Sequence, residues 1–501
     1  MKKITTIFLT VLLLCPVAFS QTAYNYLSAG NTIVQVNNNG MLFNDIDFNN
    51  IGFEVPKGSG LTTMYTSSLW IGGLDEQNKL RLAAQTYGQT GSDYFAGPID
   101  KTGMAVNPAN WNYIYKVSAE EIELHKLSYT EPNYVVPTNI ANWPVDYGDG
   151  FDGPYATFFD KDQDGEYEPA EGDYPVIMGN EESYFVMNDL YSIHSESNAM
   201  QMGIEVRVHT YVFTDDEVGN AVFVRYEIIN KSDRNYIDVH AGIFTDFDLG
   251  DYSDDLVGTD ENLDMYYAYN GSPSDALYGA KPPAQAVVFL NQPLTYSVAY
   301  NNDWGPQGNP TTAEHYYNYI SGKGLDGNPF PEPLAYTGDP CNNTGNLQTG
   351  SGDRRMLGST NGFNLAAGGT YKFDVAYVYA QGTSNTQSVC ELRDRVSTIK
   401  QLYNNGGITT VKAVDKNAHP VKVYPNPTDG SATVTFYNPN KEIFSIEVYN
   451  TVGQLVLKED TREPQFTLPE GEMQEGIYYV RVRKKSDKKD TDSETVKLVV
   501  N

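Results

Sequence analysis

The sequence predicts an all-β protein: a β-sandwich-rich body with a few short helices. The chain has 501 residues and 38 Tyr, and aromatic side chains favour strands and half-buried surfaces. Its 44 Gly and 26 Pro supply the turns between short strands. Several segments also alternate apolar and polar residues with a period of two, which is typical of a strand with one buried face.

The first 20 residues have the pattern of a secretory signal peptide. Two lysines precede an apolar core over residues 7–15, and small residues allow cleavage between Ser20 and Gln21. The apolar run is too short to span a bilayer. The pattern therefore predicts export rather than a membrane anchor.

The strands of the body are predicted from local alternation. Residues 67–75 predict a buried strand, and residues 80–87 predict its hairpin partner. The strongly alternating segments 204–213 and 221–230 predict a long hairpin with one buried face. Residues 373–379 predict a further strand.

Two short helices are expected to interrupt the strands. A capping box starts at Thr311, and Gly322 ends that helix. A second capping box starts at Ser388 with Glu391, and Gly406 ends the helix that follows. Its predicted apolar face consists of Leu392, Val396, Ile399 and Tyr403.

The charge of the chain restricts its partners. The net charge of −30 argues against nucleic acid or an anionic membrane surface as a partner. An acidic chain suits an extracellular setting that is rich in divalent cations.

Residues 160–171 match the calcium-loop pattern D-x-[DN]-x-[DN]-G-x₅-E, with Gly165 at the sharp turn. The flanking Gly-Pro and Gly-Asp-Tyr-Pro segments leave no room for long helices, so we expect a helix-less calcium loop. The alternative is a solvated acidic turn. The expected oxygen ligands are Asp160, Asp162, Asp164, the carbonyl of Glu166, and Glu171.

A second acidic run follows the predicted hairpin, with Gly250 and Gly258 as hinges. Its spacing fits no standard loop pattern. Calcium binding, turn capping by Asx hydrogen bonds and simple solvation remain alternatives. The candidate metal ligands are Asp246, Asp248, Asp251, Asp254 and Asp255.

No catalytic residue is assigned from the sequence. The chain lacks a G-x-S-x-G elbow, an H-E-x-x-H helix, a phosphate-binding loop and a C-x-x-C pair. The segment from His194 to Glu196 is best interpreted as a polar turn. Carboxylate pairs for glycosidic chemistry stay open, because their separation cannot be inferred from a sequence.

Two cysteines remain after removal of the signal, Cys341 and Cys390. An oxidising compartment would allow them to form a disulfide, and two free thiols are the alternative.

Residues 421–501 resemble the C-terminal (type A) sorting domain of type IX secretion cargo proteins. The blocks that carry this resemblance are V-Y-P-N-P at 423–427, V-Y-N-T-V-G-Q-L-V at 448–456, G-I-Y-Y-V-R-V at 476–482 and K-L-V-V at 497–500. The resemblance implies an immunoglobulin-like sandwich of seven strands, consistent with the alternation in these blocks. The matching candidates for recognition by the secretion machinery are Pro425, Asn426, Pro427, Gly453, Gly476 and Lys497.

The resemblance also implies a cellular location and an order of domains. In that family the tail directs export across the outer membrane, and the body is then tethered to surface lipopolysaccharide or released. The expected order is a signal peptide over 1–20, an acidic body over 21–412 with room for two subdomains, a linker over 413–420 and the sorting tail over 421–501.

The body resembles uncharacterised secreted surface proteins of the same class. It shares their L-W-I-G-G-x-D segment at 69–75, a G-D-Y-P segment at 172–175 and a G-D-R-R segment at 352–355. This resemblance implies architecture and address, and no activity.

These observations predict a secreted or cell-surface protein of the outer membrane, stabilised by calcium, with a structural or adhesive role. Its aromatic, acidic surface would contact glycans, matrix or partner proteins. The alternative is an extracellular hydrolase acting on polysaccharide or protein, and a third class is a calcium-dependent self-assembling layer protein.

Overall fold

The computed structural model describes residues 22–45, 51–87, 91–132, 134–215, 217–301, 305–408, 421–436, 438, 441–451, 454–469, 471, 473–485 and 493–501. The predicted signal peptide, its cleavage site at Ser20 and Gln21, and the predicted linker lie outside these residues. Gly453 of the sorting tail also lies outside them.

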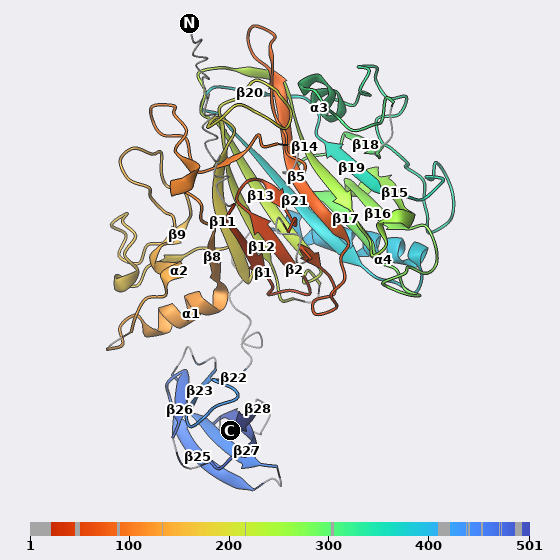
Figure 1. Ribbon diagram of the computed structural model, residues 1–501. Coiled ribbons are helices and arrows are strands. Elements are labelled where there is room, and N and C mark those ends of the chain that lie inside the picture. Colours follow the sequence, from red (N-terminus) through yellow and green to blue (C-terminus); the bar gives the residue numbers. More distant parts are fainter. Residues whose placement is uncertain are drawn as a thin grey trace, which may run out of the picture.

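A nine-stranded antiparallel sheet forms one half of the body (Figure 1). In spatial order its main path is β15 (Asp255–Asp260), β16 (Met265–Asn270), β17 (Ala284–Phe289), β21 (Thr370–Ala380), β13 (Ala221–Asn230), β12 (Ile204–Val212), β11 (Glu181–Asn188) and β7 (Phe95–Ala96), and β8 (Tyr115–Ser118) also pairs with β11. The predicted hairpin of 204–213 and 221–230 is the antiparallel pair of β12 and β13 at its centre.

A seven-stranded antiparallel sheet forms the other half of the body. Its main path is β18 (Tyr296–Tyr300), β19 (Arg354–Ser359), β14 (Tyr236–Phe247), β5 (Met64–Leu74) and β3 (Met41–Leu42), while β20 (Phe363–Leu365) pairs with β14 and β6 (Leu80–Ala83) pairs with β5. The predicted strands 67–75 and 80–87 correspond to β5 and β6, which form the expected antiparallel pair.

The two sheets face each other across the main hydrophobic core. Leu69 and Ile71 of β5 and Ile243 of β14 are buried in one cluster with Val206 of β12 and Val224 of β13. Each of these residues stands on the inward face of an alternating strand, which explains why the period-two pattern was visible in the sequence. The predicted all-β, sandwich-rich class is confirmed. A small sheet of β1 (Tyr24–Leu27), β2 (Ile33–Asn37) and β4 (Phe53–Glu54) adds to the same core.

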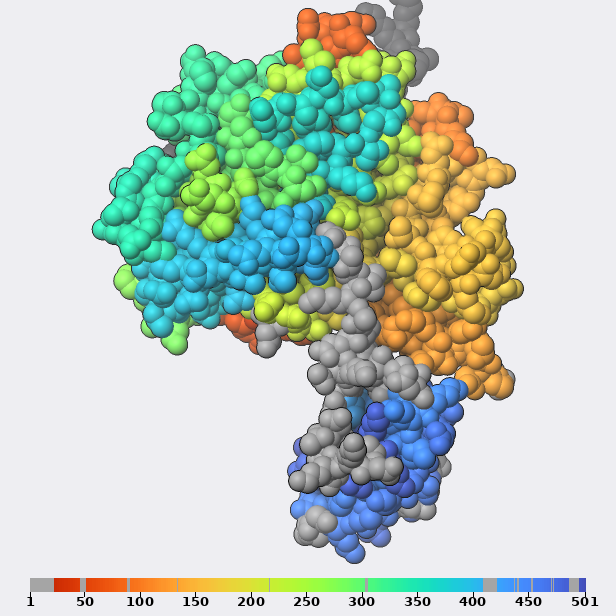
Figure 2. Space-filling model, turned by 180° about the vertical axis from the view of Figure 1, so that it is seen from behind, coloured from red at the N-terminus to blue at the C-terminus, as the bar shows by residue number. Residues whose placement is uncertain are grey.

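The helix α4 (Asn385–Asn404) covers the outer face of the nine-stranded sheet, where Figure 2 shows it in blue across the back of the body. Val389, Leu392, Val396 and Ile399 pack in one cluster with residues of β12, β13, β16, β17 and β21. The predicted start at Ser388 is wrong, because Ser384 caps the helix and accepts a hydrogen bond from the amide of Gln387. Ser388 lies inside the helix and donates to the carbonyl of Pro282 at 2.7 Å.

The helix α3 (Ala313–Ile320) covers the outer face of the seven-stranded sheet. Its N-cap is Thr312 rather than Thr311, so it begins one residue later than the predicted capping box. Trp70 of β5, Phe244 of β14, and Tyr316 and Ile320 of α3 are buried in one cluster. Each outer sheet face is therefore packed against a helix.

The remaining helices lie in connections. The α-helices are α1 (Ala119–Ser128) and α2 (Thr138–Ala141), and the 3₁₀ turns are η1 (Pro108–Asn110), η2 (Pro169–Glu171), η3 (Tyr252–Asp254) and η4 (Glu261–Leu263). Helix α1 was not predicted, although Ser118 and Glu121 form a complete capping box at its start. None of the described helices combines the length and apolar character that a membrane span requires.

The tail forms a separate sandwich, drawn in blue in Figures 1 and 2. Three strands form one sheet, in the order β22 (Lys422–Tyr424), β23 (Ala432–Thr435) and β26 (Gln465–Leu468). Four strands form the other, in the order β25 (Leu455–Thr461), β24 (Phe444–Asn450), β27 (Gly476–Lys484) and β28 (Ser493–Val500). Val434, Val448 and Val480 are buried in their shared core, so the predicted seven-strand sandwich is confirmed.

Cys341 and Cys390 form a disulfide. It joins the first half of α4 to the loop around residue 341, with the two Cα atoms 5.8 Å apart.

Candidate metal centres

The calcium-loop motif lies between β9 (Phe158–Phe159) and β10 (Tyr174–Pro175), which pair antiparallel. Phe159 and Tyr174 are register partners, and their rings stack with centroids 4.7 Å apart. This pairing brings the two ends of the loop together without an adjoining α-helix. Asp160 and Asp173, which directly follow and precede these strands, therefore become neighbours.

Three carboxylates converge in this loop, which we call the loop centre. One oxygen each from Asp160, Asp162 and Asp173 lies within 4.8 Å of the others. Asp173 is buried, whereas Asp162 is exposed. Asp173 accepts hydrogen bonds from the amides of Lys161, at 3.0 Å, and Glu168, at 2.9 Å, so it ties both sides of the loop to its base. The sequence motif did not include Asp173.

Backbone amides of the loop donate hydrogen bonds to the carboxylate of Asp160. Its oxygens accept the amides of Gln163 at 2.6 Å and Gly165 at 2.8 Å. Although desolvation opposes the shift, these amides hold the pKa of Asp160 below its ordinary value. Gly165 has a φ of 90°, which is the left-handed turn that the motif assigns to glycine.

The other predicted ligands of this loop lie outside the three-carboxylate group. Asp164 accepts the amide of Glu166 at 2.8 Å and so closes a local turn. Glu171 ends η2 with an exposed side chain, and its carbonyl accepts a hydrogen bond from Nζ of Lys161 at 2.8 Å. The motif predicts Glu171 as the closing ligand, whereas in the structure Asp173 is the third carboxylate of the group.

A second group of three carboxylates, the buried centre, forms where β14 meets β19. One oxygen each from Asp246, Asp248 and Asp353 lies within 4.8 Å of the others. Asp246 of β14 is the register partner of Arg355 in β19, and Asp353 directly precedes β19. Strand pairing therefore brings together residues that are far apart in the chain.

Asp246 is the most buried member of this centre, with 4% of its surface exposed. Its Oδ2 accepts the hydroxyl of Tyr87 at 2.7 Å and lies 3.5 Å from Nη2 of Arg355. Its Oδ1 is buried and has no hydrogen-bond partner among the described residues. An unpaired carboxylate oxygen in this setting is costly unless a ligand contacts it.

Negative charge exceeds positive charge in the buried centre. Arg355 also pairs with Asp353 at 3.2 Å, so one guanidinium faces three carboxylates. Burial raises the pKa of Asp246 to about 7, and the charge of Asp248 adds to the effect against the opposing charge of Arg355. Burial, followed by the charge of Asp353, raises the pKa of Asp248 to about 6. A bound cation would reverse both effects.

The remaining predicted ligands of the acidic run serve the turn beside this centre. Asp251 caps η3 by accepting the amide of Ser253. Asp255 is fully buried and accepts the amide of Leu249 at 3.1 Å, and burial raises its pKa well above the ordinary value. Neither these residues nor Asp254 belong to the three-carboxylate group.

The histidine segment singled out in the sequence is structural. The His194 ring is buried, with Nε2 2.7 Å from the carbonyl of Asp189 and Nδ1 3.5 Å from Asp93. The hydroxyl of Ser195 donates to the carbonyl of Ser92. His194 and Ser195 therefore have different partners, and the structure shows no hydrogen bond between their side chains among the described residues.

A cavity of about 410 Å³ contains two carboxylates, Glu182 and Glu227. Glu182 lies 2.7 Å from Nδ1 of His209, and Glu227 pairs with Lys372 at 2.7 Å. Although burial opposes the shift, Lys372 holds the pKa of Glu227 below its ordinary value. A general acid needs the opposite shift, so this pair gives no support to glycosidic chemistry.

In the tail, the structure joins two of the predicted sorting residues. Nδ2 of Asn426 donates to the carbonyl of Lys497 at 2.7 Å, and its Oδ1 accepts the amide of Val499 at 2.9 Å. Asn426 therefore fastens the Pro425–Pro427 turn to β28. Gly476 begins β27 on the other side of β28.

Comparison with known proteins identifies the tail. Residues 422–501 match the family model of the secretion system C-terminal sorting domain. No curated protein sequence matches the chain.

Two solved structures are similar over part of the chain. A polysaccharide lyase is 9% identical, with 59% of this chain and 34% of that chain covered and a TM-score of 0.20. PorZ of Porphyromonas gingivalis, described as an essential bacterial surface component of the type-IX secretion system, is 11% identical, with 70% and 48% covered and a TM-score of 0.14. The chain spans less than half the length of either, and neither likeness informs function.

Proposed function

Since this chain is a cargo protein of the type IX secretion system, addressed by its sorting domain to the cell surface or the medium, we propose that its body is a calcium-stabilised structural or adhesive protein. Calcium would bind at the loop centre (Asp160, Asp162 and Asp173) and at the buried centre (Asp246, Asp248 and Asp353). The sorting domain contacts the secretion machinery, and the body acts after delivery.

The observation that carries this proposal is at Asp246, a member of a group of three carboxylates, whose buried Oδ1 has no hydrogen-bond partner in the described part of the chain. Both centres offer only oxygen ligands, which suits calcium or magnesium and not a soft transition metal. Calcium is favoured because it accepts irregular cages of six to eight oxygens, whereas magnesium demands near-ideal octahedral geometry.

Calcium at these positions would fix connections rather than drive signalling. The buried centre links the end of β14 to the segment before β19, and the loop centre closes the β9–β10 connection. Extracellular calcium modules bind at about 10⁻⁴–10⁻³ M, so millimolar calcium contributes on the order of 1 kcal/mol per site. Constant occupancy of this kind suits a rigid surface protein.

The test is a thermal melt of the purified protein in chelator and in millimolar calcium. We expect calcium to raise the melting temperature by about 2–5 °C, because ligands that bind only the folded state stabilise it. Asp162→Asn should remove the part of this rise that comes from the loop centre, and Asp248→Asn the part that comes from the buried centre.

The matched control is Asp233→Asn, which removes the same charge from a side chain that is 89% exposed. This variant should keep the full rise. An unchanged melting temperature in calcium, or an equal rise in all variants, would refute calcium binding at both centres. Magnesium at the same concentration should give a smaller rise.

A further inference from the structure

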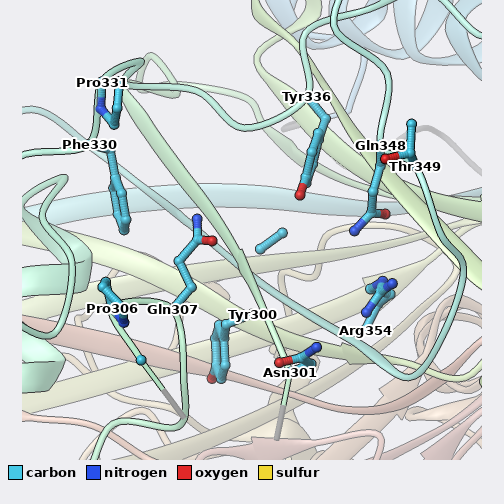
Figure 3. Close-up of a pocket in the computed structure, with 12 residues that line it drawn as sticks. Tyr300, Asn301, Pro306, Gln307, Phe330, Pro331, Tyr336, Gln348, Thr349 and Arg354 are labelled. Carbon is cyan, nitrogen blue, oxygen red and sulfur yellow. The ribbon is translucent and has the colours of Figure 1, made fainter. Parts of the chain in front are cut away.

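We infer that a cavity at the open edge of the seven-stranded sheet binds an acidic saccharide. The inference rests on the adhesive role proposed above and names the ligand of that role. The cavity has a volume of about 650 Å³, within the roughly 300–1,000 Å³ of small-ligand sites. It lies between the end of β18, the start of β19 and the loops that carry Gln307, Phe330 and Tyr336 (Figure 3).

Aromatic side chains from three segments line the cavity. Phe330 and Tyr336 stand on opposite sides of it in Figure 3, and Tyr300 lies at its base. Phe330 and Tyr336 are only partly buried, so their rings are available to a ligand. Sugar rings present flat C–H faces that pack on aromatic rings, and tyrosine adds a polar end for hydroxyl groups.

Carboxamides supply the polar part of the lining. The side chains of Gln307 and Gln348 point toward the middle of the cavity, and Asn301 lies near its base (Figure 3). A carboxamide both donates and accepts hydrogen bonds, which matches neighbouring sugar hydroxyls. Oε1 of Gln348 accepts the amide of Val257 at 2.7 Å, so this contact fixes the side chain and leaves its amino group to donate.

Arg354 gives the cavity its charge preference. Its Nη2 donates to the carbonyl of Gly350 at 2.5 Å and its Nη1 to the carbonyl of Asp353 at 3.4 Å, so these neutral partners hold the guanidinium without cancelling its charge. Its Nε is buried and has no hydrogen-bond partner among the described residues. A carboxylate or sulfate on the ligand would satisfy the guanidinium.

The charge of the lining differs from the charge of the chain as a whole. The net charge of the chain is −30, yet none of the described residues that line the cavity is an aspartate, glutamate or histidine. Among the described lining residues the only charged one is Arg354, a cation. The described lining therefore favours an anionic ligand.

Tyr336 is held in an unusual backbone conformation at this site. Its φ is 53°, which is rare for a bulky residue, and its carbonyl accepts the amide of Thr259 at 3.1 Å. Strained conformations of this kind persist where the surrounding structure enforces them, and they gather at ligand sites. Here the conformation directs the phenol ring into the cavity (Figure 3).

The test is calorimetric titration of the purified protein with trigalacturonic acid, and with maltotriose as a neutral trisaccharide. We expect the acidic trisaccharide to bind and the neutral one to bind at least about tenfold more weakly, because Arg354 would lose its anionic partner. Arg354→Gln should weaken binding of the acidic trisaccharide about tenfold or more. Phe330→Ala should weaken binding of both sugars.

The matched control is Arg462→Gln, which removes the same charge from an exposed residue of the tail sandwich, between β25 and β26, and should leave binding unchanged. Equal binding of both sugars by the wild type and Arg354→Gln would overturn the inference. So would binding of an acidic peptide such as triglutamate without binding of any saccharide. The calcium melt distinguishes the two proposals: no sugar binding with an intact calcium response refutes only the saccharide site, whereas sugar binding without a calcium response refutes only the metal centres.

Discussion

The two acidic centres contain the same three chemical groups in different surroundings. In the loop centre, backbone amides of the same loop satisfy Asp160 and Asp173, and Asp162 is exposed to water. In the buried centre, Asp246 lies at a strand pairing, with one arginine nearby and one oxygen that has no hydrogen-bond partner among the residues that the structure describes. The comparison teaches that a sequence motif and an energetic need for a cation are separate properties.

The pKa shifts run in opposite directions in the two centres. Hydrogen bonds lower the pKa of Asp160 against the effect of desolvation, whereas burial raises the pKa of Asp246 to about 7. The loop centre therefore already stabilises the ionised form of its carboxylate Asp160. The buried centre destabilises the ionised form of Asp246, so a bound cation would stabilise this centre more.

The largest expected difference concerns removal of one carboxylate in chelator. Asp246→Ala leaves the Tyr87 hydroxyl without its acceptor and should cost about 1–3 kcal/mol of unfolding free energy, less the repulsion with Asp248 and Asp353 that it relieves. Asp160→Ala should cost far less, because water replaces its exposed contacts. Denaturant titration of both variants measures the difference. Equal losses would show that the two centres are energetically alike.

The second largest expected difference between the centres is how their contribution to stability in chelator depends on pH. The folded-state pKa values of Asp246 and Asp248, about 7 and about 6, lie above the ordinary value of 3.8. The folded protein then holds protons that the unfolded chain releases, so the stability contribution of these groups falls as pH rises through 6 to 7. Melting curves between pH 5 and 8 should show the wild type losing stability relative to Asp248→Asn. Parallel profiles for the two proteins would contradict the raised pKa values.

The smallest expected effect is at Glu171, the residue that the calcium-loop motif assigns as the closing ligand. Its side chain is exposed and lies outside the three-carboxylate group, so Glu171→Gln should leave the melting temperature unchanged in chelator and in calcium. Asp173→Asn serves as the comparison and should lower it in both conditions. If Glu171→Gln instead abolished the rise in melting temperature in calcium, the bound ion would have to rearrange the loop so that Glu171 becomes a ligand, as the motif predicts.

Local patterns predicted the strands well and the helix starts less well. The predicted segments 204–213, 221–230 and 373–379 fall on β12, β13 and β21, because each strand buries alternate residues. At α4 two candidate N-caps compete within one turn. Ser384 prevails in the structure, where Ser388 is used instead to contact the Pro282 carbonyl, a tertiary contact that no local pattern contains.

The candidate centres show the same limit. Asp160 and Asp162 were found because their spacing is local. Asp353 joins Asp246 through the register of β14 and β19, and that register is set by packing of whole strands. The cavity gathers residues from several separate segments, and of these the sequence analysis singled out only the G-D-R-R segment that contains Arg354.

The Cys341–Cys390 disulfide has a consequence for how the body survives outside the cell. The bond spans 49 residues and joins α4 to a neighbouring loop, and Arg393 of the same helix also pairs with Asp260 at 2.9 Å. A helix that lifts from the sheet therefore stays tethered at high effective concentration and returns quickly. Proteases outside the cell cleave a segment only while it is detached. Because the disulfide makes the helix return faster, it shortens that time and protects the outer face of the nine-stranded sheet.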